Sequence, residues 1–254
     1  MKLHHQISGS GEPLIILHGL FGTLENWGAQ TLELSQYFQV ISVDLRNHGR
    51  SPHSDVMSYE AMADDIQQLM QELTIERAHI MGHSMGGKVA MQLALSQPQL
   101  INKLIIADIA PVSYEPHHDE IFAGLNAIKL AELTSRKDAD NALASHVQTP
   151  AVRAFLLKNL YRDEQQHFRW RPNLDALQRE YHNISKPPHG TPFPSAALFI
   201  KGMNSNYILR EHSNAINALF PAARFKIIEG AGHWLHAEKP KIFSKIVLNF
   251  LNRG

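Results

Sequence analysis

The segment best suited to chemistry is residues 82–86, Gly-His-Ser-Met-Gly, which carries the pattern Gly-x-Ser-x-Gly around Ser84. A β-rich run precedes it and a helix-like run follows it. In this setting the serine occupies a sharp strand-to-helix turn, and the glycines let strand and helix approach without Cβ clashes. The turn exposes the hydroxyl at a helix N-terminus, where backbone N–H groups favour a developing negative charge. We therefore predict Ser84 as a nucleophile; the alternative is a tight turn in which Ser84 only caps the helix.

A general base is predicted near the C-terminus, where His233 stands between Gly232 and Trp234 after the last β-rich run. A histidine there lies at the carboxyl edge of a parallel sheet, where α/β proteins place their sites. Its imidazole can take the proton of a serine hydroxyl near neutral pH. His236 is the competing candidate, and we expect it in the next helical turn, facing elsewhere.

A third group must orient the imidazole and stabilise its charged form. The usual place for it is the turn after the penultimate strand, but residues 202–207, Gly-Met-Asn-Ser-Asn-Tyr, contain no carboxylate. Asp108 ends an earlier strand at the same edge and is the predicted acid, although a loop-capping role is the alternative. Ser205 could form a hydrogen bond near the imidazole, and Glu211 is a weaker candidate for the acid.

An acyl-transfer site also needs two N–H donors for the oxyanion of its tetrahedral intermediate. One is expected from Met85, the residue after the nucleophile, and the other from the glycine-rich loop 18–22, His-Gly-Leu-Phe-Gly. Within that loop Leu20 is our first choice and Phe21 the second. Without the serine motif, the sequence of this loop would indicate only an ordinary glycine-rich turn. We expect Phe21 and Trp234 to line the substrate pocket.

The elements that must position these residues alternate between strand and helix. Continuous apolar runs are typical of strands buried on both faces of a parallel sheet. Apolar residues at helical spacing separate them, so the sequence predicts an α/β fold, a mostly parallel sheet flanked by helices. The predicted strands cover residues 14–17, 40–43, 79–81, 104–106, 197–200 and 224–228, with 3–7 as a possible edge strand, and the predicted helices cover 59–73, 88–96 and 241–251.

The alternation stops in the middle of the chain. Residues 119–133, 149–160 and 173–183 have helical patterns, and we expect no strand in this stretch. We predict a core of residues 1–112 and 195–254 and a helical cap of residues 113–194 inserted between two strands. The alternative is a separate helical domain with the same boundaries. Three apolar cap residues are expected to cover an acyl pocket, namely Phe122, Leu125 and Phe155.

Composition restricts the partners of the protein. The chain has 254 residues, of which 44% are hydrophobic and 19% charged, so a large core is expected. Lys+Arg and Asp+Glu are equal at 24 each, which gives no reason to expect a nucleic acid or an anionic membrane. There is no cysteine, and the 16 histidines show no metal-binding spacing, so neither a metal nor a cofactor is expected. No apolar run approaches a membrane span, and we expect a cytoplasmic protein.

Together these motifs make the chain resemble the α/β-hydrolase superfamily along its whole length and, more narrowly, the YbfF-type bacterial esterases. The resemblance implies carboxylesterase activity, extending to acyl-CoA thioesters, through an acyl-Ser84 intermediate under a helical cap. The chain departs from the commonest pattern by lacking an acid after the penultimate strand, and the narrower resemblance supports Asp108 in that role. The segments that carry it are residues 46–49 with 51–52, 82–88, 108–112, 118–123, 204–205 with 207, and 230–234 with 236–240.

Other functions remain open on this fold, because fold alone does not decide the substrate. The same three catalytic residues could perform cofactor-free perhydrolysis or hydrolysis of a C–C bond. A non-catalytic ligand receptor is an alternative of another class, but it would have no need to keep all three residues. The leading hypothesis is hydrolysis of a small-molecule acyl ester or thioester.

Overall fold

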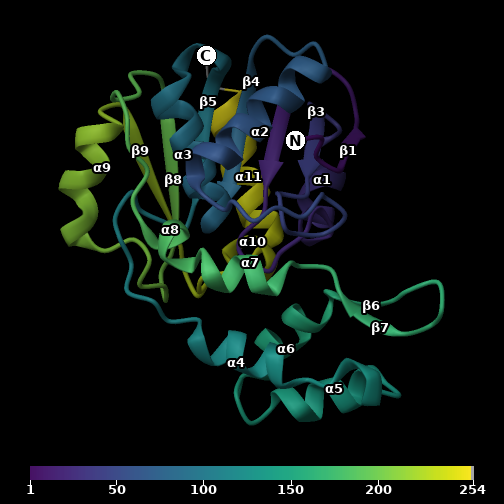
Figure 1. Ribbon diagram of the computed structural model, residues 1–254. Helices are drawn as coiled ribbons and strands as arrows, with labels where there is room; N and C mark the ends of the chain where they lie inside the picture. Colours follow the sequence, from purple (N-terminus) through teal and green to yellow (C-terminus); the bar gives the residue numbers. More distant parts are fainter. Residues whose placement is uncertain (253–254) are drawn as a thin grey trace.

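The computed structural model describes residues 1–252 and contains a seven-stranded sheet in the order β1-β3-β2-β4-β5-β8-β9. All neighbouring strands are parallel except β1, which pairs antiparallel with β3. This confirms the predicted α/β fold with a mostly parallel sheet (Figure 1). The strands are β1 (His5–Ser8), β2 (Pro13–Leu17), β3 (Gln39–Val43), β4 (Ala78–His83), β5 (Ile101–Ala107), β8 (Ala197–Gly202) and β9 (Ala223–Ile228).

The central strands end level with one another. Leu17 of β2 pairs with Gly82 of β4, which in turn pairs with Ile106 of β5. The loops that follow these strands therefore leave the sheet at the same carboxyl edge. That edge brings the loop after Leu17, the turn at Ser84 and the turn at Asp108 together, as the sequence pattern predicts.

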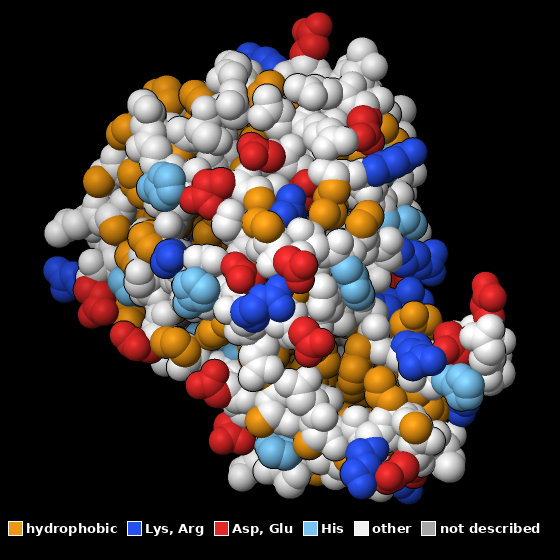
Figure 2. Space-filling model, in the orientation of Figure 1, with side chains coloured by type: hydrophobic (Ala, Val, Ile, Leu, Met, Phe, Trp, Pro, Cys, Tyr) orange, Lys and Arg blue, Asp and Glu red, His pale blue; other side chains and the backbone are white. Residues whose placement is uncertain are grey.

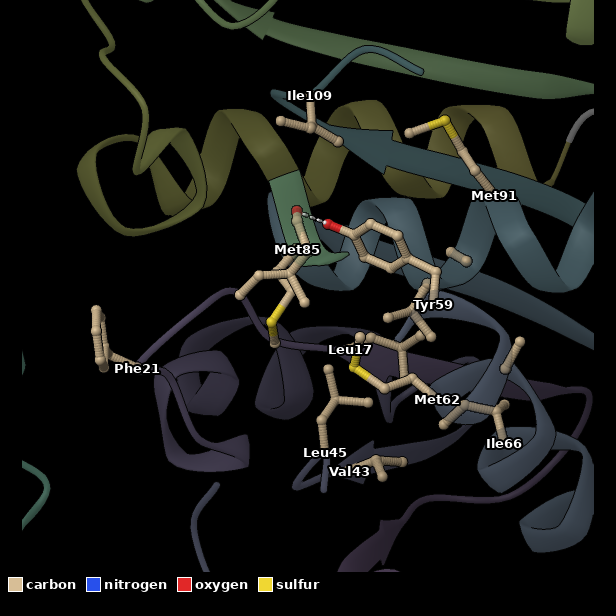
Figure 3. Close-up of a cluster of buried hydrophobic side chains, with 14 of the residues drawn as sticks. Leu17, Phe21, Val43, Leu45, Tyr59, Met62, Ile66, Met85, Met91 and Ile109 are labelled. Carbon is tan, nitrogen blue, oxygen red and sulfur yellow. Dashed lines mark hydrogen bonds between the residues drawn. The ribbon is translucent and has the colours of Figure 1, made fainter. Parts of the chain in front are cut away.

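Helices cover both faces of the sheet and enclose two hydrophobic clusters. On one face, α2 places Met62 and Ile66 against the strands (Figure 3). Leu69 of α2 and residues of the cap belong to the same cluster. On the other face, α1 and α11 pack against the opposite side of the strands. The helices of this part are α1 (Gly28–Leu34), α2 (Tyr59–Glu72), α3 (Met85–Ser96), α9 (Ser213–Leu219), α10 (Leu235–Glu238) and α11 (Pro240–Leu251).

The cap lies between β5 and β8 in the chain and below the carboxyl edge of the sheet in Figure 1. Figure 2 shows hydrophobic side chains in the hollow where this lobe meets the core. Its elements are α4 (Asp119–Ala127), α5 (Arg136–Leu143), α6 (Pro150–Leu157), β6 (Leu160–Arg162), β7 (Phe168–Trp170), α7 (Leu174–Arg179) and α8 (Tyr181–Ser185).

Two features of the cap differ from the sequence-based expectation. The expectation of no strand is wrong, because β6 and β7 form an antiparallel hairpin whose turn is held by Asp163, which accepts the amides of Gln165 and His167. Strands of three residues are too short for alternation to be visible in the sequence. The predicted helix 119–133 also ends early, at Ala127, and α5 was not predicted.

No helix within residues 1–252 has the length and hydropathy that crossing a membrane requires.

Candidate active site

The turn at Ser84 explains the glycines around it. Ser84 has φ 51° and ψ −120°, a conformation that side chains rarely adopt and that costs energy to maintain. A Cβ at Gly82 would lie 2.1 Å from the carbonyl oxygen of Gly86. A Cβ at Gly86 would lie 2.4 Å from the carbonyl oxygen of His18. The strand, the helix α3 and the loop after β2 therefore meet so closely that only glycine fits at both positions.

Ser84, His233 and Asp108 form one hydrogen-bonded chain. The Ser84 Oγ lies 3.0 Å from His233 Nε2, and His233 Nδ1 lies 2.8 Å from Asp108 Oδ2. Asp108 is fully buried, and its other oxygen accepts the amide of Gly202 at 3.0 Å. With Nδ1–H donated to the carboxylate, Nε2 is left free to accept the proton of the serine hydroxyl.

Ser205 joins this chain, and Glu211 does not. The Ser205 hydroxyl donates to Asp108 Oδ2, the same oxygen that accepts from His233. Glu211 lies on an exposed 3₁₀ turn and pairs only with His212 among the described residues. The turn after β8, where the common acid is missing, thus supplies a neutral donor that supports the carboxylate brought in by β5.

Two backbone amides near Ser84 are free to bind an oxyanion. Met85 is the first residue of α3, so its N–H has no acceptor within the helix. No acceptor for the amide of Leu20 is found among residues 1–252. The amide of Phe21, our second choice, instead donates to Nε2 of His48 at 3.2 Å. The geometry therefore favours Leu20 over Phe21 as the loop donor.

Two buried neutral histidines hold the loop that carries Leu20. Nδ1 of His48 donates to the carbonyl of Arg46, which leaves Nε2 to accept the Phe21 amide. His18 likewise donates through Nδ1 to the carbonyl of Gly19 and accepts the amide of Leu45 at 3.0 Å. Burial lowers the pKa of His18 to about 4. It also lowers the pKa of His48 to about 3, with the nearby His18 adding to the effect. Both rings therefore stay neutral and keep an acceptor nitrogen at neutral pH.

His48 lies in one of the segments that carry the family resemblance, but the sequence pattern gives it no role in the site, because that role is a single long-range hydrogen bond to Phe21. The cap adds a second contact to the same loop: the side chain of Asn159 donates to the carbonyl of Phe21 at 2.7 Å. Phe21 itself has φ 58°, so this loop is held from both sides in an unusual conformation.

Two neighbours confine the imidazole of His233, and neither is among the site residues that the sequence predicts. The ring of Tyr207 stacks on it, with centroids 3.9 Å apart and planes 23° apart. His83, the residue before Ser84, donates through Nε2 to the backbone carbonyl of His233 at 2.8 Å. Burial lowers the pKa of His83 well below its usual value, so it remains a neutral donor. His236 lies in α10, as expected, and stacks on Trp27.

A cavity of about 260 Å³ opens beside Ser84 and His233 under the cap. Phe21, Trp234 and Phe155 line it. Phe122 does not belong to its lining; its ring packs edge-on against Phe21, with centroids 5.2 Å apart, and supports that residue from behind. Among residues 1–252, no three His, Cys, Asp or Glu side chains gather as a metal site would require.

The fold and this site are those of an α/β hydrolase. The family model described as the alpha/beta hydrolase fold matches residues 12–240, and the chain belongs to this family.

Individual relatives cover nearly the whole chain. Esterase YbfF of Escherichia coli is 39% identical over 244 residues, which is 96% of this chain and 94% of the relative. The sn-1-specific diacylglycerol lipase ABHD11 of Xenopus laevis is 39% identical over 250 residues, which is 95% of this chain and 80% of that protein. The solved structure titled marine microorganism esterase is 43% identical, with a TM-score of 0.96, and covers 98% of this chain and 99% of its own. The chain is thus similar to ester hydrolases along its length.

Proposed function

We propose that the protein is a serine carboxylesterase that works through an acyl-Ser84 intermediate. His233 takes the proton of the Ser84 hydroxyl as the oxygen attacks the ester carbonyl, and the amides of Leu20 and Met85 bind the resulting oxyanion. The protonated imidazole then gives its proton to the leaving alkoxide, and the alcohol departs. Water, activated by His233, releases the acid and restores the serine. Asp108 holds the imidazole and stabilises its charged form.

The observation that carries this proposal is the unbroken hydrogen-bonded chain from Ser84 through His233 to buried Asp108, beside two unoccupied amide donors. A turn that merely capped α3 would need neither the base nor the acid, and the Ser84 side chain makes no capping hydrogen bond. The chemistry described uses only groups of the chain and water.

The relatives bear on the substrate. Their names include esterase and diacylglycerol lipase, which favours ester hydrolysis over perhydrolysis, C–C cleavage or a receptor role. We extend the proposal to small and medium acyl esters and to acyl-CoA thioesters, because the same attack on a carbonyl expels an alcohol or a thiol. A cytoplasmic location belongs to the same proposal.

A fluorophosphonate probe, which reacts with activated serines, tests the proposal against the receptor alternative. We expect one equivalent of the probe to bind to Ser84 and to abolish hydrolysis. The His233→Ala variant should be labelled more slowly. A panel of p-nitrophenyl esters and acyl-CoAs then ranks esters against thioesters. An enzyme that remains unlabelled and hydrolyses none of the panel would overturn the proposal.

A further inference from the structure

Two cavities, not one, open onto Ser84. The large cavity of about 260 Å³ is lined by both Ser84 and His233. A second chamber of about 50 Å³ is lined by Ser84, Met85 and Leu20, but His233 does not belong to its lining. Ser84 and Leu20 line both spaces, whereas Met85 lines only the small chamber and His233 only the large cavity.

The position of the base decides which half of an ester enters which space. The imidazolium of His233 must reach the oxygen of the leaving alcohol to protonate it, so the alcohol has to lie on the side of His233. The carbonyl oxygen points to the amides of Leu20 and Met85. The remaining substituent of the carbonyl carbon, the acyl chain, is left with the side away from His233. We propose that the large cavity binds the alcohol and that the small chamber binds the acyl group.

The small chamber limits the acyl group to a short one. Its volume of about 50 Å³ is about one fifth of the 260 Å³ of the large cavity. Its walls are tied together: the hydroxyl of Tyr59 donates to the carbonyl of Ile184 (Figure 3), and the hydroxyl of Tyr114 donates to the carbonyl of Tyr207. The chamber therefore has room for a short acyl chain only.

The far wall of the chamber is polar, which also disfavours a long alkyl chain. Lys88, one helical turn after Ser84, is fully buried, and its ammonium donates to the carbonyls of Ser185 at 3.1 Å and Lys186 at 2.7 Å. The same ammonium lies 4.8 Å from the ring centroid of Tyr114. Burial lowers the pKa of Lys88 to about 7. Methylene groups that pushed into this wall would separate the buried amine from its two carbonyl acceptors, at a cost in free energy.

The large cavity is suited to an apolar alcohol. Val152, Phe155 and Leu156 of α6 line it on the cap side, and the rings of Phe155 and Trp234 in its lining contact each other, with centroids 5.8 Å apart. This assignment corrects the expectation for Phe155, which lines the alcohol cavity, whereas the acyl chamber is covered by another part of the cap that includes Ile184 of α8. The inference rests on the proposed function and narrows its range of small and medium acyl groups: the preferred substrate is a short acyl group on a bulky apolar alcohol or thiol.

Two isomeric esters separate the alternatives without a difference in composition. Hexyl acetate places its chain on the alcohol, and ethyl hexanoate places it on the acyl group. We expect kcat/KM for hexyl acetate to exceed that for ethyl hexanoate by at least about tenfold, the order expected when a few methylene groups lose their pocket. An equal or greater value for ethyl hexanoate would overturn the inference.

Two variants test where each half of the ester binds. Each variant is judged by the ratio of its rates on two esters, because a general loss of folding lowers both rates and leaves the ratio unchanged. Phe155→Ala should lower activity on hexyl acetate several-fold more than on ethyl acetate. Ile184→Ala, which deepens the small chamber, should raise the rate on ethyl hexanoate relative to hexyl acetate. The opposite shifts would contradict the assignment. The Ser84→Ala variant distinguishes a failure of this inference from a failure of the proposed function. Ser84-dependent hydrolysis of both isomers at equal rates would contradict only this inference. Turnover by folded Ser84→Ala protein would contradict the proposed function.

Discussion

The carboxyl edge of the sheet and the cap that covers it are built by different physical means. At the edge, backbone segments approach so closely that glycine is required, and Phe21, Ser84 and Asp108 all adopt positive φ values. The cap consists of helices of five to nine residues and a short hairpin. Part of its stability comes from partly exposed ion pairs such as Arg153–Asp140, which contribute little individually.

This difference separates the two tasks of the site. The edge fixes the positions of the reacting atoms, where an error of an ångström is expensive in rate. We infer that the cap supplies apolar surface that selects a substrate, so that a changed side chain there alters a preference. Substitutions at the edge should therefore lower kcat for all esters, and substitutions in the cap should redistribute activity among esters.

The largest effect is expected from Asp108→Asn. The amide preserves the packing but removes the charge that stabilises the imidazolium, and it can favour the wrong tautomer of His233. The corresponding change in a well-studied serine protease lowers kcat by about 10⁴, and we expect a loss of several orders of magnitude here. Measured kcat on p-nitrophenyl acetate, with circular dichroism to verify folding, gives the answer.

Glu211→Gln is the matched control for that variant, because Glu211 is an exposed carboxylate outside the hydrogen-bonded chain. It should retain wild-type kcat. If Glu211→Gln were inactive while Asp108→Asn kept its activity, the assignment of the acid would be wrong, although Ser84 and His233 would keep their roles.

A smaller effect is expected from the two residues that hold the backbone of Phe21. His48→Phe removes the acceptor of the Phe21 amide and loosens the loop that carries Leu20, so kcat should fall about 10- to 100-fold, below the loss of a whole oxyanion donor. His48→Gln, whose carbonyl can accept the same bond, should recover part of the activity.

Asn159→Ala removes the contact that the cap makes with the same residue. We expect less than about a tenfold fall in kcat, because one neutral hydrogen bond contributes about 1 kcal/mol. A larger loss for Asn159→Ala than for His48→Phe would mean that the cap, not the core, sets the geometry of the oxyanion loop.

Ser205→Ala should cost less than Asp108→Asn by a wide margin. The hydroxyl donates to the carboxylate but supplies no charge at neutral pH, so about a tenfold loss of kcat is expected. The matched measurement is the pH profile of kcat/KM for the two variants. A Ser205→Ala enzyme as inactive as Asp108→Asn would show that the carboxylate cannot hold His233 without this donor.

The smallest effect on the rate, but a clear effect on stability, is expected from His236→Phe. Burial, with a smaller contribution from the nearby His233, lowers the pKa of His236 from 6.5 to about 3, so between these values the unfolded chain binds the proton and the folded protein does not. The free energy of unfolding therefore decreases as the pH falls through this window. At about pH 5 the contribution of this one residue to the decrease is at most about 2 kcal/mol.

Phenylalanine keeps the stacking on Trp27 and cannot bind a proton. Urea unfolding of both proteins at about pH 7.5 and about pH 5 should show a smaller loss of stability for the variant. The same loss in both proteins would mean that His236 does not remain neutral as the folded protein is acidified.

The contrast between the edge and the cap also explains what the sequence could predict. Gly82 and Gly86 are required by backbone contacts within a few residues of Ser84, so the turn was recognisable from a short pattern. The strands beside it are continuous apolar runs. Because parallel strands end at a common edge of the sheet, the position of Asp108 directly after one of them predicts that it lies at the edge shared with Ser84. The hairpin β6–β7 and the helix α5 are short and lack a strong periodic pattern, so the sequence predicts the cap less accurately than the edge of the sheet.

Residues that act through a single long-range contact receive no role in the site from the sequence pattern. His48 meets Phe21 across 27 positions of sequence, and Asn159 meets it across 138. Tyr207 stacks on His233 only because β8 and β9 end side by side. The division of the site into two chambers likewise depends on side chains from both the core and the cap, which no local pattern brings together.

The most direct test of the central claim is to trap the acyl-enzyme. Wild-type protein is mixed with p-nitrophenyl acetate, quenched in acid during turnover, digested and examined by mass spectrometry. We expect one acetyl group on the peptide that contains Ser84, carried by that serine. Folded Ser84→Ala protein should carry none on the corresponding peptide and should not turn over the ester. The acyl-Ser84 mechanism would be contradicted by an acetyl adduct on another residue that forms and decays at the rate of turnover, or by unchanged turnover by Ser84→Ala.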